Sequence, residues 1–271
     1  MAIHKFESVA DYGRHVKTLL GHRRARDWGT SGAGESLAES VDHAINGNTK
    51  LVGEAERLMD KLQTSIEVRS RQWGGAVAGA FPCVPDYLIG HPESMRKLDD
   101  CVSDSTPLRV FCATSSSAGM NWEQLQQRGV AVLAATIALC QSRPVELWTF
   151  TPFAGNGGHG ECNIMVRINS SPLCLSEACV ALGSIGFDRN MGMTIGYVED
   201  TFDGDWARVL KTVGFSDEQN TIAACRDLLG AGDSDLIIPP AHGSFKQIYA
   251  DPIGWVQKII NQYSISEITN D

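Results

Sequence analysis

The sequence predicts an α/β protein with a mainly parallel, doubly wound sheet and an N-terminal helical extension. From residue 108 onward, short runs rich in β-branched and aromatic residues alternate with segments whose apolar residues recur at helical spacing. These runs are mostly apolar, and residues 236–238 are apolar throughout, which is typical of strands covered on both faces. The first hundred residues show helical spacing and few such runs.

Composition limits the classes of protein to consider. The chain has 271 residues, of which 43% are hydrophobic and 20% charged, so it can bury a large core. The net charge of −9 argues against a globally basic nucleic-acid coat but leaves room for a local basic face. No apolar run approaches the roughly 20 residues of a membrane span or forms a signal peptide at the start, so we expect a cytoplasmic protein that does not contact membranes.

Two parts are expected along the chain. Residues 1–106 are predicted to form a helical extension and a Gly/Pro-rich crossover packed on the core, and residues 107–271 a sheet domain. Helical spacing in the extension predicts helices over residues 8–20, 34–45 and 50–62. The apolar, Gly/Pro-rich stretch that follows Trp73 favours an ordered crossover over a flexible linker.

The sheet domain is predicted from alternating runs. We expect strands over residues 108–113, 145–150, 163–168, 193–198 and 236–238. We expect helices over residues 122–141, 173–183, 206–213, 222–229 and 252–262. The eight cysteines show no close paired spacing and are interpreted as reduced and mostly buried.

The turn after residues 108–113 is rich in serine. Ser115 and Ser117, with the strand before and the helix after them, make this region resemble a von Willebrand factor A-type domain. The resemblance implies a D-x-S-x-S turn that holds Mg²⁺ through oxygen ligands. Ala113 replaces the aspartate, so we expect a vestigial motif and no bound metal, although Asp188 or Asp200 could supply a distant carboxylate. A simpler interpretation is that the serines satisfy the turn and cap the helix.

Two glycine-rich segments invite a comparison with nucleotide-binding loops. Residues 29–36 differ from a phosphate-binding loop because Glu35 stands where a lysine must reach the phosphates. We expect a mobile loop there, before a helix capped by Thr30 or Ser31. Residues 155–160 include His159 and are predicted to be a loop at the edge of the sheet. No motif for metal or nucleophilic catalysis is present, so no cofactor is expected and an enzyme is not the first hypothesis.

Basic and aromatic residues cluster at two places in the extension. Such pairs suit single-stranded nucleic acid, because guanidinium groups neutralise phosphates while an indole ring stacks on a base. The alternative is a solvated helix face with a tryptophan anchored to the core. The predicted nucleic-acid-binding residues are Arg23, Arg24, Arg26, Trp28, Arg69, Arg71 and Trp73.

The segment from Trp73 to Met95, followed by the predicted sheet, is similar to the Drc-type single-stranded-DNA-binding RNA polymerase cofactors of schitovirus phages. The resemblance implies a non-enzymatic, oligomeric phage protein of the host-cell cytoplasm. Such a protein would bind single-stranded DNA at melted promoters and recruit the phage RNA polymerase.

A competing hypothesis belongs to a different class. The von Willebrand A resemblance implies an adaptor that binds protein rather than nucleic acid, with an AAA+ ATPase as the implied partner. A hydrolase using the His159 loop is a third hypothesis.

Overall fold

The computed structural model describes most of the α/β core and several connecting segments. The described residues are 2–25, 27, 35–63, 73–77, 81–82, 84–88, 90–92, 94–98, 107–115, 122–140, 143–154, 161–170, 173–199, 208–209, 218–241 and 247–263.

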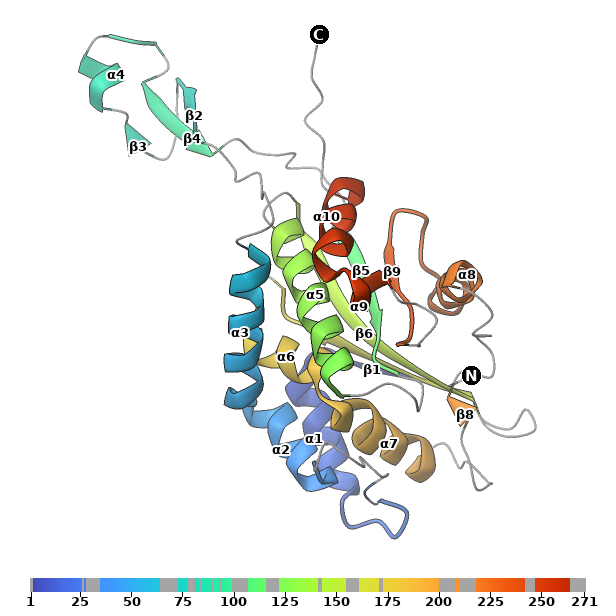
Figure 1. Ribbon diagram of the computed structural model, residues 1–271. Helices are drawn as coiled ribbons and strands as arrows, with labels where there is room; N and C mark the ends of the chain where they lie inside the picture. Colours follow the sequence, from blue (N-terminus) through green and yellow to red (C-terminus); the bar gives the residue numbers. More distant parts are fainter. Residues whose placement is uncertain are drawn as a thin grey trace.

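One twisted sheet forms the centre of the molecule (Figure 1). Its strand order is β1-β7-β6-β5-β9, with β8 paired to β6 beside this path. β5 runs parallel to both β6 and β9, β7 is antiparallel to β6, and β1 is parallel to β7. The predicted mixed α/β class is therefore confirmed. The strands are β1 (Ala2–Phe6), β5 (Leu108–Ala113), β6 (Val145–Ala154), β7 (Glu161–Ile168), β8 (Arg208–Val209) and β9 (Leu236–Ile238).

The first face of the sheet is covered by several helices. Leu108, Val110 and Cys112 of β5 pack into one large apolar cluster with residues of these helices. Consecutive residues 130–135 of α5 are all buried, because the helix lies between the sheet and other helices. The helices of this cluster are α1 (Val9–Leu19), α2 (Leu37–Asn46), α3 (Thr49–Gln63), α5 (Trp122–Cys140), α6 (Leu175–Gly183), α7 (Met193–Val198), α9 (Gln247–Ala250) and α10 (Pro252–Tyr263), with the π-helix η2 (Phe187–Gly192).

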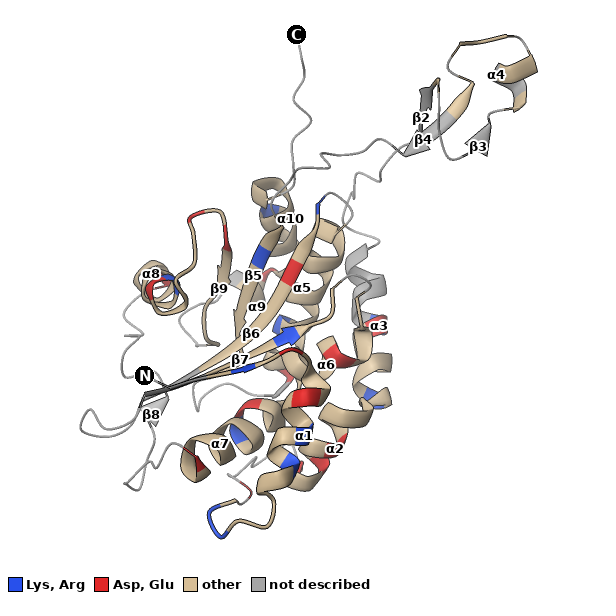
Figure 2. Cartoon of the chain, turned by 180° about the vertical axis from the view of Figure 1, so that it is seen from behind, with Lys and Arg blue, Asp and Glu red and all other residues tan. Residues whose placement is uncertain are grey.

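The second face is covered differently. Helix α8 (Glu218–Leu229) packs on Phe111, Phe150 and Ile237. Over β6, the ring of Trp148 lies beneath the Lys5 ammonium, 4.6 Å from the ring centroid, and the Arg167 guanidinium, 5.9 Å from it. Figure 2 looks onto this face and shows basic and acidic residues on neighbouring strands. Long cationic side chains thus cover the aromatic surface there.

Two predicted elements of the sheet domain were wrong. Residues 193–198, predicted as a strand, form helix α7, which continues directly from η2. A short apolar run does not distinguish a buried strand from a buried helix, and here Ile195 packs among helices in the first-face cluster. Within the predicted helix 206–213, Arg208–Val209 form β8, and the remaining residues lie outside the described part.

The first hundred residues also contain strands that the sequence did not predict. Ala2–Phe6 form β1 of the main sheet, parallel to β7. Within the predicted crossover, β2 (Trp73–Ala76), β3 (Phe81–Pro82) and β4 (Met95–Leu98) make a second, antiparallel sheet of order β2-β4-β3, accompanied by α4 (Val84–Leu88). This small sheet stands apart from the main body (Figure 1).

The predicted cap of the second helix was also wrong. Helix α2 begins after Ser36, whose hydroxyl accepts from the backbone N–H of Glu39. The Glu39 carboxylate accepts in return from the Ser36 N–H at 2.7 Å, which completes a capping box. Ser36 therefore caps the helix, whereas Thr30 and Ser31 lie outside the described residues.

Candidate functional site

The carboxyl end of β5 is the point where the strand order of the sheet reverses. Its parallel neighbours β6 and β9 lie on opposite sides of it. In open α/β sheets, ligands bind in the crevice outside the carboxyl ends of the strands at such a switch point. Two backbone hydrogen bonds fix the chain there. The N–H of Thr114 donates to the Phe150 carbonyl at 3.0 Å, and the N–H of Ala241 donates to the Ser115 carbonyl at 2.9 Å.

A buried polar cluster occupies this position. The hydroxyl groups of Thr114 and Thr151 contact each other, and both lie close enough to the carboxyl group of Asp188 to favour its charged form. Asp188 is only 5% exposed, and burial raises its pKa to about 6, against the lowering effects of the Thr151 hydroxyl, Arg189 and the Thr114 hydroxyl. A carboxyl group thus sits in a site that disfavours its charged form.

Two oxygen atoms of the cluster lack a partner within the described chain. They are Oδ1 of Asp188 and Oγ of Ser115, and Ser115 is completely buried. A buried polar atom left without a hydrogen bond costs about 1–3 kcal/mol, so native proteins retain few of them. Asp188 also lies on a π-helix, a feature frequent at functional sites.

Arg128 of α5 forms another wall of the site. Arg128 is only 3% exposed. Its guanidinium donates from Nη2 to the carbonyl of Ala113 at 2.8 Å and to the carbonyl of Pro239 at 2.7 Å. A cavity of about 10 Å³, room for one water-sized group, lies beside it. The half-buried residues Ser184 and Arg189 line this cavity together with Asp188, so its mouth lies at the junction of α6 and η2.

The N-terminal helices hold η2 in place. The Tyr12 hydroxyl of α1 donates to the Phe187 carbonyl at 3.2 Å, and the two rings pack edge to face. The side-chain amide of Asn190 donates to the Glu35 carbonyl at 2.9 Å. The helical extension therefore positions the element that carries Asp188.

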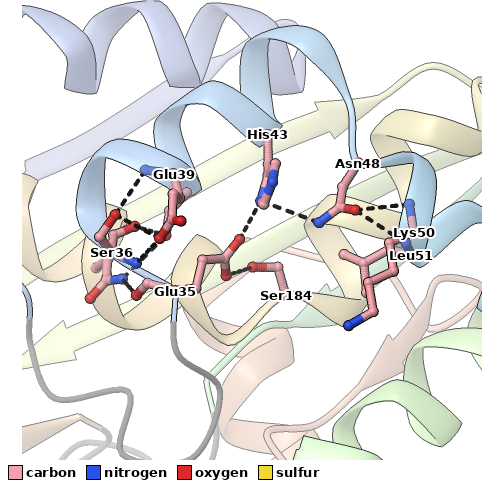
Figure 3. A network of polar contacts seen from close by, with 10 residues as sticks. Glu35, Ser36, Glu39, His43, Asn48, Lys50, Leu51 and Ser184 are labelled. Carbon is pink, nitrogen blue, oxygen red and sulfur yellow. Dashed lines mark hydrogen bonds and ion pairs between the residues drawn. The ribbon is translucent and has the colours of Figure 1, made fainter.

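Glu35 belongs to the polar network drawn in Figure 3. Its carboxylate contacts Nδ1 of His43 at 2.5 Å and accepts from Ser184 Oγ at 2.6 Å. This internal bonding agrees with the rejection of a phosphate-binding loop. Because the carboxylate lies between the histidine and the serine, the three residues do not form the serine–histidine pair that nucleophilic catalysis needs.

The Mg²⁺ that the von Willebrand A resemblance implies does not fit these residues. Ala113 stands in place of the aspartate, and its side chain packs in the second-face apolar cluster with Trp148 and Phe150. Among its described lining residues, the cavity has one carboxylate, Asp188, against the guanidinium groups of Arg128 and Arg189. Among the described residues, no group of three or more histidine, cysteine, aspartate or glutamate side chains could hold a metal ion. Such a positively charged wall disfavours a hard dication.

The sequence anticipated part of this site. Ser115 was singled out as a motif residue, and Asp188 was named as a carboxylate that could reach the turn. Ser117 and Asp200 lie outside the described residues. Thr151 and Arg128 were missed, because nothing in the local spacing shows that β6 and α5 bring them to the same strand end.

The predicted nucleic-acid-binding residues are not brought together in the described part. Arg23 is exposed, whereas Arg24 is half-buried and donates to the Tyr197 carbonyl at 3.2 Å. Trp73 begins β2 of the small sheet, far from the end of α1 in both views of the chain (Figures 1 and 2). Arg26, Trp28, Arg69 and Arg71 lie outside the described residues, as does His159.

Fold and site together define an α/β protein with a polar site at the switch point of its sheet. The chain matches the family model described as "Domain of unknown function (DUF7192)" over residues 1–250, and it therefore belongs to this family. Neither the curated proteins nor the solved structures contain a match. Within the described part, no helix is both long enough and apolar enough to cross a bilayer.

Proposed function

We propose that this chain is a von Willebrand A-like adaptor that binds a partner protein at the carboxyl ends of β5 and β6. One observation carries the proposal: Ser115 Oγ and Asp188 Oδ1 are buried at the switch point without a partner among the described residues. A polar group from a bound protein would satisfy them and recover the free energy that their isolation costs.

The chemistry of the cavity favours a protein side chain as the incoming group. Asp188 can accept a hydrogen bond, and the Ser115 hydroxyl can accept or donate one. An amide or hydroxyl group at the tip of a side chain is small enough for the cavity of about 10 Å³ beside Asp188.

A photo-crosslinking experiment tests the proposal. Benzoylphenylalanine replaces Gln127, an exposed residue of α5, and in a matched control it replaces Glu146 at the opposite end of the sheet. Irradiation in extract of the source cells should yield a nuclease-resistant protein adduct at Gln127 but not at Glu146. Asp188→Asn or Ser115→Ala should weaken the Gln127 adduct.

The identity of the adduct decides the finer proposal. Mass spectrometry that finds an AAA+ ATPase would support the partner class implied by the resemblance. An adduct that is unchanged in both variants, or that disappears with nuclease, would exclude an adaptor acting through this site.

A single-stranded-DNA-binding transcription cofactor, oligomeric and recruiting a phage RNA polymerase, is the second proposal. The exposed side chain of Arg23 favours it, since this arginine makes no ion pair with the described residues. Anisotropy of a labelled single-stranded oligonucleotide should then show binding that falls steeply with salt. Arg23→Glu should weaken the binding of the oligonucleotide. Trp73→Ala should cost about 1–3 kcal/mol of binding free energy if a base stacks there. Lys50→Glu should leave the binding unchanged. Absence of binding at low salt would refute this proposal.

A further inference from the structure

A second cavity lies at the far side of β9. It has a volume of about 380 Å³, within the range of about 300–1,000 Å³ typical of ligand sites. Residues of α8, β9 and α10 line it, and Arg128 is the one lining residue that it shares with the small polar cavity.

The lining shows that this cavity runs along the edge of the sheet. Leu236 and Ile238 belong to the first-face cluster, whereas Ile237 between them belongs to the second-face cluster. Side chains of a strand alternate between faces, so a cavity that touches all three must lie beside the backbone. It also touches α8 on one face and α10 on the other. The cavity is therefore a groove along the outer edge of β9, with a helix on each side.

The outer edge of β9 borders the groove. Within the described residues, β9 pairs only with β5, so its opposite edge has no strand beside it. An unpaired edge presents backbone N–H and C=O groups that can accept a further strand. The apolar groups of Ile222, Trp255 and Ile259 flank the groove and offer contacts for alternate side chains of such a strand.

The charge of the groove selects the occupant. Among the described residues, Arg128, Arg226 and Lys258 line it, with Glu218 as the single lining carboxylate. Arg226 donates to the backbone carbonyls of Gly232 and Asp235. These acceptors are neutral, so the hydrogen bonds do not neutralise the positive charge of Arg226. The nearby Asp235 carboxylate is itself paired with Arg109.

We propose that the groove between α8 and α10 binds an extended, acidic peptide segment of a partner protein, which adds as a strand to the free edge of β9. Backbone hydrogen bonds to β9 supply affinity for an extended chain, and the three cationic side chains supply the preference for acidic residues. The inference does not depend on the polar cluster around Asp188.

Fluorescence anisotropy with designed peptides tests this inference. The probe is a fluorescein-labelled eight-residue peptide in which valine alternates with glutamate. One control peptide has lysine in place of glutamate, and another has N-methyl groups on alternate backbone nitrogens, which removes strand pairing but keeps the charge. The glutamate peptide should bind saturably, and each control should bind about tenfold or more weakly.

Charge reversal in the protein locates the binding. Lys258→Glu combined with Arg226→Glu should weaken the binding of the glutamate peptide about tenfold or more. Lys258→Glu alone should also weaken this binding, and it leaves the Arg226 hydrogen bonds in place. Lys50→Glu on α3 makes the same charge change at an exposed site outside the groove and should have no effect.

Several results would overturn the inference. Equal binding of the N-methylated peptide would exclude strand addition, and equal binding of the lysine peptide would exclude the charge preference. Absence of saturable binding by the full chain would exclude the site. A dimer that Lys258→Glu dissociates would show instead that a second copy of the chain occupies the groove.

Discussion

The hydroxyl group of Thr151 on β6 lies close to the carboxyl group of Asp188 on the π-helix η2 and favours its charged form. This places the sheet beside a helical element that Tyr12 of α1 and the carbonyl of Glu35 hold through hydrogen bonds. The Asp188 carboxyl group is thereby fixed in a buried position where its charged form is disfavoured. The stability of the protein should depend on this group in a defined pH range.

Asp188→Asn should stabilise the protein above pH 6. Burial raises the pKa of Asp188 from 3.8 to about 6, so between these values the native state binds more protons than the unfolded state. The contribution of this group to the free energy of unfolding therefore falls as pH rises through that window. Asparagine keeps an oxygen acceptor without the charge. Urea denaturation at about pH 7.5 should show a gain of about 1–3 kcal/mol, which vanishes at about pH 4.

The pH dependence separates this effect from a packing effect. A loss or gain of the same size at both pH values would mean that the substitution changes packing, and the argument from the buried charge would then be wrong. The slope of unfolding with urea concentration should match between the two proteins, since the surface exposed is the same.

The wild-type chain should not bind Mg²⁺ or Mn²⁺ at the turn after β5. In the described part of the chain, the site has a single carboxylate beside two guanidinium groups, and Ala113 packs in the apolar second-face cluster. Calorimetry with either ion should show no saturable heat. Ala113→Asp, with its folding checked by circular dichroism, is the companion measurement: heat in this variant alone would show that the native turn lacks the necessary ligand. Binding by the wild type that Asp188→Asn abolishes would contradict the prediction.

Three cysteines should resist alkylation in the native state. Burial raises the pKa of the Cys112, Cys179 and Cys225 thiols, in the latter two to about 12, and only the thiolate is reactive. Peptide mass spectrometry after iodoacetamide treatment should show these three labelled only on unfolding, whereas the half-buried Cys174 is labelled earlier. Cys112, Cys140, Cys174, Cys179 and Cys225 are free, as the sequence predicted. Rapid native labelling of Cys225 would show that α8 opens readily.

Two apolar strands of the sheet could be predicted from sequence with their limits, and its first strand could not. β5 and β9 are short apolar runs bounded by turn residues, and their predicted limits agree with the structure. β1 was missed because five residues with a mixed pattern at a terminus carry little signal. α7 was misassigned because a buried helix and a buried strand share an apolar composition.

The candidate site is less visible in sequence than the fold. Ser115 and Thr114 follow a recognisable strand, so the turn could be located. Asp188 reaches it from a π-helix far along the chain, and Thr151 reaches it through the parallel register of β5 and β6. Such convergence depends on tertiary packing, which local spacing does not encode.

Gly129 and Gly53 should respond oppositely to replacement by alanine. A Cβ atom at Gly129 of α5 would lie 2.6 Å from the carbonyl oxygen of Leu182, so α5 and α6 would have to move apart. At Gly53, inside α3, a Cβ atom would meet nothing within 4 Å. Gly129→Ala should destabilise the protein by about 1–3 kcal/mol through overpacking, whereas Gly53→Ala should stabilise it by about 0.4–1 kcal/mol through helix propensity and reduced unfolded-state entropy. Thermal and urea denaturation of both variants would measure the contrast, and a neutral Gly129→Ala would show that the contact between α5 and α6 can relax without loss of packing.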